Sequence, residues 1–276
     1  MEGFLLSFFI ILIISIPFAY RYIRLGSLGL YFDNDTKLIN NQNYKYAEKF
    51  RVIQVILGSA FFFIHGVFFW GLINIIIFFV IALVISFFME IIGSKIGYVF
   101  GGTYCYNKNN TPGYILFGVP LLIPLAWFGI IYMSMNFCYF ITDIKFPYDN
   151  IINNYYYIIL TALLVVLLDT ILDPIAVNEN RWTWNAPGIY YGIPFLNFFG
   201  WFLTSIIILF LFKRLCHPII IPINQFSLYF QYSPGILFIF LPIIASRPCF
   251  ERGLKIPGYI GIFLSLFYIF ISIVKY

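Results

Sequence analysis

The sequence predicts an all-α polytopic membrane protein, a bundle of about eight transmembrane helices, with seven as the alternative. Of its 276 residues, 62% are hydrophobic and only 10% are charged, whereas soluble domains carry about 25% charged residues. The apolar residues gather in runs of roughly 20, the length that crosses a bilayer. No shift in composition marks a second domain, so we expect residues 1–276 to form a single integral membrane domain, multi-pass in the cell membrane.

The first three spans are expected in the N-terminal third of the chain. The first covers Phe4–Tyr20, and we expect a retained anchor because no basic segment precedes it and no small-residue cleavage site follows. A polar loop is expected over Arg21–Arg51. The apolar run Val52–Glu90 would form a helix of about 58 Å, nearly twice the hydrocarbon thickness. We therefore expect it to split near Phe69–Leu72 into the second and third spans.

Proline marks the limits of several later spans. Pro120 and Pro124 are expected to kink the first turns of the fourth span. Pro174 disfavours helical structure at the residue before it, so the fifth span is expected to end at Leu172. The fourth to eighth spans are expected at Leu116–Ile141, Tyr155–Leu172, Pro194–Phe212, Gly235–Ser246 and Pro257–Val274.

The distribution of Lys and Arg predicts the orientation. With eight spans and both chain ends outside, the inner loops hold twelve of the sixteen basic residues. If the second and third spans are merged, ten basic residues lie inside and six outside. The positive-inside rule therefore favours eight spans over seven. These basic residues lie in loops, and the net charge of +5 therefore does not indicate a nucleic-acid partner. The same topology brings the inner end of the third span beside the inner end of the fifth.

Two carboxylates in the fifth span, Asp169 and Asp173, are the main functional signal. At i and i+4 they share a helix face, about 6 Å apart along the axis. Carboxylates are costly in hydrocarbon unless they are protonated, paired or hydrated. The helix C-terminus, the apolar surroundings and the like-charged neighbour all favour a proton on at least one of them, which suits a general acid. The alternative is that Asp173 only caps a loop and that Asp169 pairs with Arg181.

Glu90 ends the third span, and the topology places it beside this pair. The alternative is an interfacial glutamate that pairs with Lys95. Two segments that mix aromatic residues with glycine, Gly97–Tyr106 and Trp182–Gly192, lie at the same end. Glycine allows close approach to a ligand and aromatic rings can stabilise a carbocation, although an ordinary interfacial belt is the alternative. Candidate substrate-binding residues are Tyr104, Trp127, Trp182, Trp184, Tyr191, Asn197 and Trp201.

The remaining polar residues indicate less. Asn197 in an apolar helix either bonds a neighbouring helix or positions water or substrate. His65 lies deep in the second span and is expected to be a core histidine with its hydrogen bonds satisfied. The four cysteines form no CxxC pair, so neither a zinc site nor a disulfide framework is expected. No dinucleotide or P-loop motif is present, and no cofactor is expected.

Three blocks of the chain resemble the carotenoid-biosynthesis integral membrane protein family, which includes carotenoid 1′,2′-hydratases and bisanhydrobacterioruberin hydratases. The blocks are MEIIGSKIGYVFGGTYCY (Met89–Tyr106), GVPLLIPLAW (Gly118–Trp127) and DTILDPIAVNENRWTWNAPGIYYGIPFLNFFGW (Asp169–Trp201), in the family's order. The third block is the most specific of them.

The resemblance implies hydration of a terminal isoprenoid C=C bond of a carotenoid, by protonation and capture of water inside the membrane. Such a reaction needs no redox cofactor and no evident metal. Asp169 or Asp173 would be the acid, Glu90 or the other aspartate would orient the water, and Asn197 would help to hold it. The expected partners are a lipophilic carotenoid and membrane lipid, with room for association with other carotenoid-pathway membrane enzymes. The residues expected to form a cation-stabilising wall are Trp182, Trp184 and Trp201.

Three alternatives remain open. An intramembrane prenyltransferase would hold magnesium through Asp-rich motifs, but this chain has a single D-x-x-x-D and few loop cations for a diphosphate. A non-catalytic carotenoid- or lipid-binding protein would use the carboxyl groups only to shape a pocket. A small transporter would use them as a proton relay, although the chain has no inverted repeat.

Overall fold

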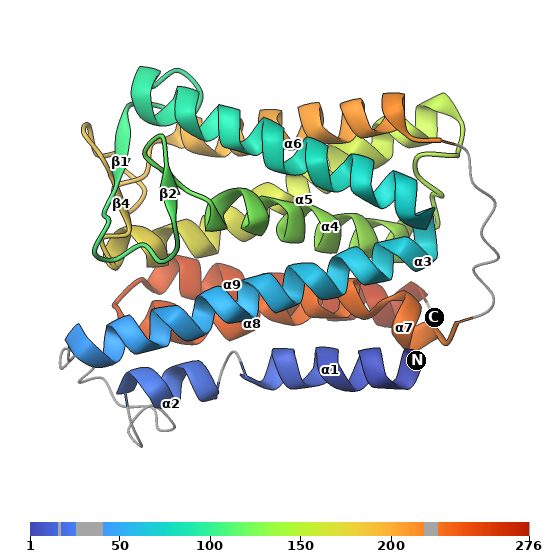
Figure 1. Ribbon diagram of the computed structural model, residues 1–276, viewed down its shortest axis with the longest axis horizontal. Helices are drawn as coiled ribbons and strands as arrows, with labels where there is room; N and C mark the ends of the chain where they lie inside the picture. Colours follow the sequence, from blue (N-terminus) through green and yellow to red (C-terminus); the bar gives the residue numbers. More distant parts are fainter. Residues whose placement is uncertain (16–17, 26–40, 218–225, 276) are drawn as a thin grey trace.

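The structure, a computed structural model, describes residues 1–15, 18–25, 41–217 and 226–275 (Figure 1). Most of these residues are helical, and four short strands form two antiparallel pairs, β1 with β4 and β2 with β3. The helices are α1 (Glu2–Ser15), α2 (Ala19–Leu25), α3 (Asn41–Ile96), α4 (Leu122–Thr142), α5 (Ile151–Asn178), α6 (Phe195–Leu215), α7 (Leu228–Gln231), α8 (Ser233–Glu251) and α9 (Lys255–Lys275). The strands are β1 (Tyr104–Tyr106), β2 (Ile115–Leu116), β3 (Val119–Pro120) and β4 (Trp182–Trp184).

The long helix α3 is a helical hairpin. Its backbone leaves helical geometry at Gly71 (φ 76°, ψ 160°), a conformation that glycine adopts without steric cost. The ring centres of Phe63 and Phe79 lie 5.6 Å apart, although a straight helix would separate these residues by about 24 Å. Figure 1 shows the chain reversing its direction here. The predicted division of Val52–Glu90 near Phe69–Leu72 is therefore confirmed.

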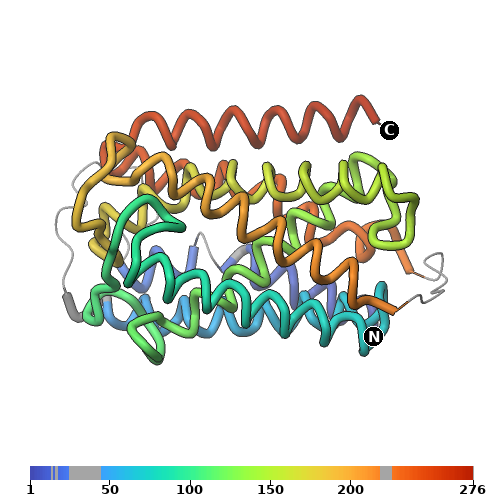
Figure 2. The backbone as a smooth tube through the Cα atoms, turned by 90° about the horizontal axis from the view of Figure 1, so that it is seen from above, coloured from blue at the N-terminus to red at the C-terminus, as the bar shows by residue number. Residues whose placement is uncertain are grey.

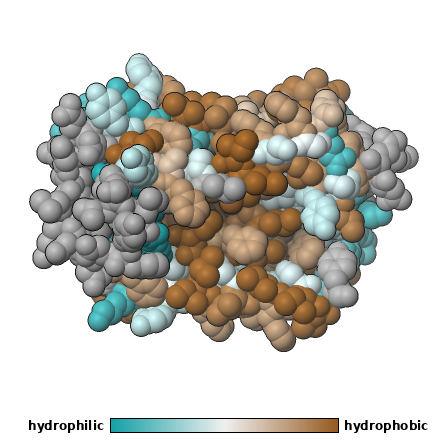
Figure 3. Space-filling view, turned by 90° about the horizontal axis from the view of Figure 1, so that it is seen from below, coloured by the Kyte–Doolittle hydropathy of each residue, from teal (hydrophilic) through white to brown (hydrophobic). Residues whose placement is uncertain are grey.

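The bundle has the character of a membrane-spanning domain. Among the described residues, α3, α4, α5, α6, α8 and α9 are long and apolar enough to cross a membrane. Because α3 has two antiparallel halves, these helices provide seven spans, and the apolar helix α1, shorter than a membrane span, lies beside them (Figure 1). Apolar side chains cover the middle of the face in Figure 3, with hydrophilic ones towards its two ends. The predicted all-α polytopic architecture is confirmed.

The two ends of the bundle differ. Both chain termini lie at one end, together with the Gly71 turn (Figure 1). The strands, α2 and the beginning of α3 lie at the other end, which we call the strand end; Figure 2 shows the same arrangement from above. This arrangement agrees with the predicted order of spans. That the strand end faces the inside of the cell stays a prediction.

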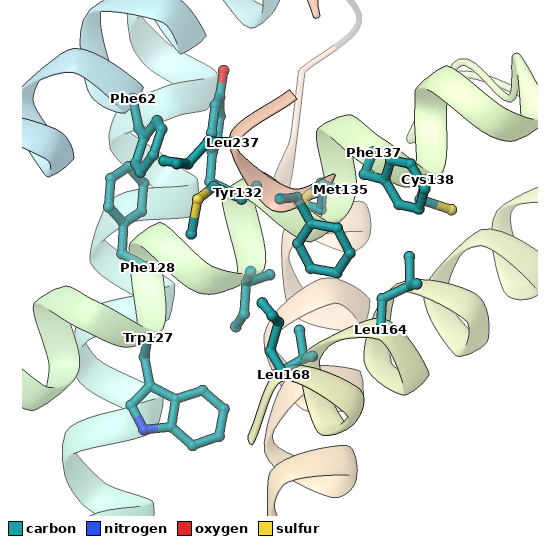
Figure 4. Packing of buried hydrophobic residues seen from close by; sticks show 14 of the residues in the cluster. Phe62, Trp127, Phe128, Tyr132, Met135, Phe137, Cys138, Leu164, Leu168 and Leu237 are labelled. Atoms are coloured by element: carbon teal, nitrogen blue, oxygen red, sulfur yellow. The ribbon is translucent and has the colours of Figure 1, made fainter. Parts of the chain in front are cut away.

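α4 lies at the centre of the packing and contacts α3, α5 and α8. In Figure 4 its side chains fill the space towards Phe62 of α3, while Leu164 and Leu168 of α5 point towards it from the other side. The rings of Phe137 in α4 and Phe238 in α8 stack with their centres 5.2 Å apart. This packing fixes the N-terminal turns of α4, which carry Trp127, at the strand end.

Some predicted boundaries are wrong. α4 begins at Leu122 rather than Leu116, because residues 115–116 pair with residues 119–120 as β2 and β3. The polar loop expected at Arg21–Arg51 is helical up to Leu25 and again from Asn41, and residues 26–40 lie outside the described residues.

The seventh span is longer than the predicted Gly235–Ser246, since α8 continues through two internal prolines to Glu251. Near Pro242 the Ser265 hydroxyl of α9 accepts from the backbone N–H of Ile243 (3.0 Å) and donates to the carbonyl of Ile239 (2.7 Å). A side chain from the neighbouring helix thus satisfies the backbone where a proline disturbs the helix.

Candidate active site

A cavity of about 1060 Å³ extends from the strand end into the bundle. Its walls come from helices α1 to α6 and α8 and from strands β1 and β4. The three predicted carboxyl residues line it, as do six of the seven predicted substrate-binding residues: Tyr104, Trp127, Trp182, Trp184, Asn197 and Trp201. The structure thus brings together residues that are far apart in the sequence. A largely apolar cavity with convergent polar groups is the usual form of a ligand site. Six arginines also line this one: Arg21, Arg24, Arg51, Arg181, Arg247 and Arg252.

Asn197 joins the two aspartates. Its amide nitrogen donates to Oδ2 of Asp169 at 3.0 Å and to Oδ2 of Asp173 at 2.7 Å. All three side chains are buried. Asn197 lies in the first turn of α6, so the contact is a hydrogen bond between helices that leaves both acids at the cavity. Among the described residues Asp169 has no other hydrogen-bond partner, and its second carboxyl oxygen is therefore available to a ligand.

Glu90 accepts hydrogen bonds from three aromatic side chains. The indole Nε1 of Trp127 donates to Oε1 at 3.0 Å, the Tyr106 hydroxyl donates to Oε2 at 2.7 Å, and the Tyr104 hydroxyl donates to the same Oε2. Glu90 is buried, and the ammonium group of Lys95 lies over an aromatic ring rather than beside it. A carboxyl group surrounded by donors has the geometry of a proton acceptor.

The pairing of β1 with β4 arranges the aromatic residues around Glu90. The register places Tyr104 opposite Trp184 and Tyr106 opposite Trp182. Because alternate residues of a strand share a face, all four rings are on the side of the cavity that they line. Burial raises the pKa of both tyrosines well above 10, so their hydroxyl groups stay protonated as donors. Tyr106 is not among the predicted site residues, although its i, i+2 spacing from Tyr104 is the signal that identifies it.

The tryptophans line the space between the acidic groups. Trp127 and Trp201 stack with their ring centres 3.8 Å apart and an interplanar angle of 18°. Trp182 lies next to the carboxyl group of Asp173. Trp184 is fixed by a hydrogen bond of 3.0 Å from its indole nitrogen to the carbonyl of Phe100. Electron-rich ring faces beside carboxyl groups can stabilise a positive charge on a bound molecule.

Pro174 predicts that the fifth span ends at Leu172. The helix instead continues to Asn178. Proline has no N–H to donate to the carbonyl four residues earlier, that of Thr170. The hydroxyl of Tyr190 donates to this carbonyl at 2.8 Å, which removes much of the cost of the proline. Asp173 is therefore a buried helical residue and not the cap of a loop. Neither aspartate lies in the last turn, so the helix dipole contributes less than expected to the protonation of the pair.

Two residues lie outside the site. Tyr191, predicted to bind substrate, does not line the cavity; its hydroxyl accepts a hydrogen bond of 3.3 Å from the backbone nitrogen of Ile256. His65 is the core histidine that the sequence predicts. Its Nδ1 lies 2.7 Å from the hydroxyl of Tyr132, and its Nε2 lies 2.9 Å from the carbonyl of Phe230.

A buried group of ion pairs lies at the strand end and is not predicted from the sequence; we call it the charge cluster. Arg181 binds Glu48 at 2.9 Å and Glu179 at 2.7 Å, rather than Asp169, and Arg24 binds Glu179 at 2.7 Å. Burial alone would raise the pKa of Glu179, but the surrounding guanidinium groups hold this pKa well below its ordinary value. The members of the charge cluster are Arg21, Arg24, Arg51, Arg181, Arg247 and Arg252 with Glu48, Glu179 and Glu251.

No group of three or more His, Cys, Asp or Glu side chains within the described residues has a metal-binding arrangement. The carboxyl groups of Glu90, Asp169 and Asp173 face amide, indole and hydroxyl donors. Carboxyl groups with such partners are able to donate or accept a proton.

The fold and the site define a polytopic membrane protein with buried carboxyl groups in an aromatic-lined cavity. The sequence profile of the family described as "Carotenoid biosynthesis protein" matches residues 50–268, which include the three carboxyl residues and the aromatic wall. The chain belongs to this family, and the predicted membership is confirmed. Comparisons with curated proteins and with solved structures find no significant match.

Proposed function

We propose that this protein hydrates a terminal isoprenoid C=C bond of a carotenoid within the cell membrane. One observation carries the proposal: an aspartate pair held by Asn197 and a glutamate held by three donors line the same aromatic cavity. A proton donor and a proton acceptor are what the addition of water to an alkene requires. The family supports a role in carotenoid biosynthesis.

The aspartate pair supplies the proton. Two carboxyl groups bridged by one amide in an apolar cavity are most stable when one of them carries a proton. Asp169 is the preferred acid, because its second oxygen has no partner among the described residues. The acid gives its proton to the less substituted carbon of the double bond. The π electrons form the new C–H bond and leave a tertiary carbocation at the neighbouring carbon.

The aromatic wall stabilises this carbocation. The stacked rings of Trp127 and Trp201 and the ring of Trp182 line the cavity and present π faces to a bound molecule. A cation over an aromatic face gains about 2 kcal/mol or more when it is desolvated.

Glu90 completes the reaction as the base. A water molecule attacks the carbocation through its oxygen, and Glu90 takes the proton released as the C–O bond forms. The product is a tertiary alcohol, heavier than the substrate by one water. Glu90 is then protonated and the aspartate pair has lost one proton. Transfer of that proton back to the pair, directly or through water, restores the site.

The test is expression of the chain in cells that accumulate lycopene, followed by mass analysis of the pigments. We expect products heavier by one water for each reacting end. Asp169→Asn and Glu90→Gln should each lower product formation at least about 100-fold, within the range lost when a general acid or base is removed. Asp149→Asn, a matched change near the far end of α5, should have no effect. Full activity of both site variants would refute the proposed roles.

The same experiment distinguishes the alternatives. Lycopene that copurifies with the protein and stays chemically unchanged would favour a carotenoid-binding protein over an enzyme. Magnesium-dependent consumption of a prenyl diphosphate would favour a prenyltransferase. Isolation in mild detergent would also show whether other enzymes of the pathway associate with the chain.

A further inference from the structure

The cavity continues beyond the carboxyl groups into a region that the proposed reaction does not use. We call this region the apolar arm; it lies between α1, the first half of α3, α4 and α8. Most of its lining is hydrocarbon, and the amide of Gln54, a polar group beside it, is bonded to the hydroxyl of Ser15 at 2.9 Å. Its principal lining residues are Phe9, Val55, Gly58, Phe62, Met133 and Leu237.

Helix geometry gives the length of the apolar arm. Trp127, which bonds Glu90, and Met133 are six residues apart on α4, or about 9 Å along its axis. The rings of Phe63 and Phe79 face each other across the α3 hairpin, which places Glu90 level with the neighbourhood of residue 52. The apolar arm therefore continues for about 15 Å beyond that level as far as Phe62. It is long enough for a chain of several bonds and too deep for the reacting end alone.

Gly58 lies partway along the apolar arm and leaves an unusual amount of space. It lines the cavity, and a Cβ atom placed on it would meet no other atom within 4 Å. A side chain added at this position would therefore begin in open space on the cavity side of the helix. The preceding residue, Leu57, does not line the cavity and is 36% exposed on the outer surface of the same helix.

We propose that the apolar arm binds the unreacted isoprenoid chain of the substrate and that Gly58 is a specificity-determining residue for long chains. The inference rests on the proposed function, because the reacting double bond must lie at the carboxyl groups. A terminal double bond has its chain on one side only, and the apolar arm is the hydrocarbon-lined space continuous with the acids. Burial of that chain contributes about 25 cal/mol per Å² of apolar surface.

The test compares a long and a short substrate in three proteins. Wild type, Gly58→Phe and Leu57→Phe are assayed with lycopene and with geranylacetone, a short isoprenoid that has the same type of terminal double bond. We expect Gly58→Phe to lower kcat/KM for lycopene about tenfold or more, as steric changes in apolar pockets do. Its activity on geranylacetone should stay near that of wild type. Leu57→Phe should match wild type on both substrates, as a control for the added ring.

An equal effect of Gly58→Phe on both substrates, or no effect on either, would overturn the inference. Lycopene retention separates this failure from failure of the proposed function, because binding needs no reaction. If wild type retains lycopene through purification and Gly58→Phe does not, the apolar arm binds the chain even when no product forms. Equal retention by both proteins would overturn the assignment of the apolar arm.

Discussion

Replacement of Asn197 by leucine tests the arrangement of the two acids. Leucine has nearly the same size but removes the amide that donates at 3.0 Å to Asp169 and at 2.7 Å to Asp173. A hydrogen bond to a neutral acceptor contributes about 1 kcal/mol, and one to an ionised acceptor about 2 kcal/mol. With one acid neutral and the other ionised, about 3 kcal/mol of positioning is lost. Since 1.36 kcal/mol is tenfold in rate, kcat should fall about 100-fold.

The assay is single-turnover hydration of lycopene by purified protein, with melting temperature measured in parallel. Thr204→Val is the matched control. Thr204 is a buried residue two turns further along α6, and its hydroxyl has no hydrogen-bond partner in the described part of the chain. Its loss should leave the rate unchanged. If folded Asn197→Leu keeps more than about a third of the wild-type rate, the amide does not position the acids and the reasoning is wrong.

Three further predictions concern the charge cluster and the base. Arg181→Met should lower the stability by about 3 kcal/mol, because it leaves buried carboxylates with fewer partners, and the melting temperature by about 6 to 12 °C; the exposed Lys108→Met should change neither. The pKa of Glu179 lies well below its ordinary value of 4.5. The stability that ionised Glu179 gives to the folded protein is therefore complete above pH 4.5 and declines as the pH falls further. Melting curves of wild type should show this decline, and those of Glu179→Gln should not. Trp127→Phe keeps an aromatic ring but removes the indole donor of Glu90, so kcat should fall about tenfold while lycopene is still retained; an unchanged kcat would contradict the role of that hydrogen bond.

Much of the bundle follows from local physical chemistry. The length of Val52–Glu90 alone requires a turn near its middle, and Gly71 provides it. The convergence of Glu90 with Asp169 and Asp173 follows from counting spans, because antiparallel neighbours bring alternate loops to the same end.

The remaining features depend on contacts that no local pattern encodes. Pro174 lacks a backbone donor and so predicts a helix end, but the helix continues because the hydroxyl of Tyr190 donates to the free carbonyl of Thr170. That contact exists only after the chain has folded back on itself. The charge cluster joins Arg21 to Glu251 and Arg181 to Glu48, pairs that are far apart in the sequence.

The strands are predictable from the sequence only in part. The alternation of aromatic residues with small ones in Tyr104–Tyr106 and Trp182–Trp184 is a two-residue period, typical of strands. Their pairing partner and register are tertiary features. The register determines that four rings line the cavity instead of two, and it is what adds Tyr106 to the donors around Glu90.

Isotope labelling of the product tests the central claim most directly. Purified protein is given lycopene in deuterium oxide enriched in heavy oxygen, and the product is analysed by mass spectrometry. Protonation by a carboxylic acid in exchange with solvent predicts one deuterium on the carbon next to the new alcohol and heavy oxygen in its hydroxyl group. The Asp169→Asn, Asp173→Asn double variant should form no product. A hydroxyl oxygen that does not come from water, a product without carbon-bound deuterium, or full activity of the double variant would contradict the account.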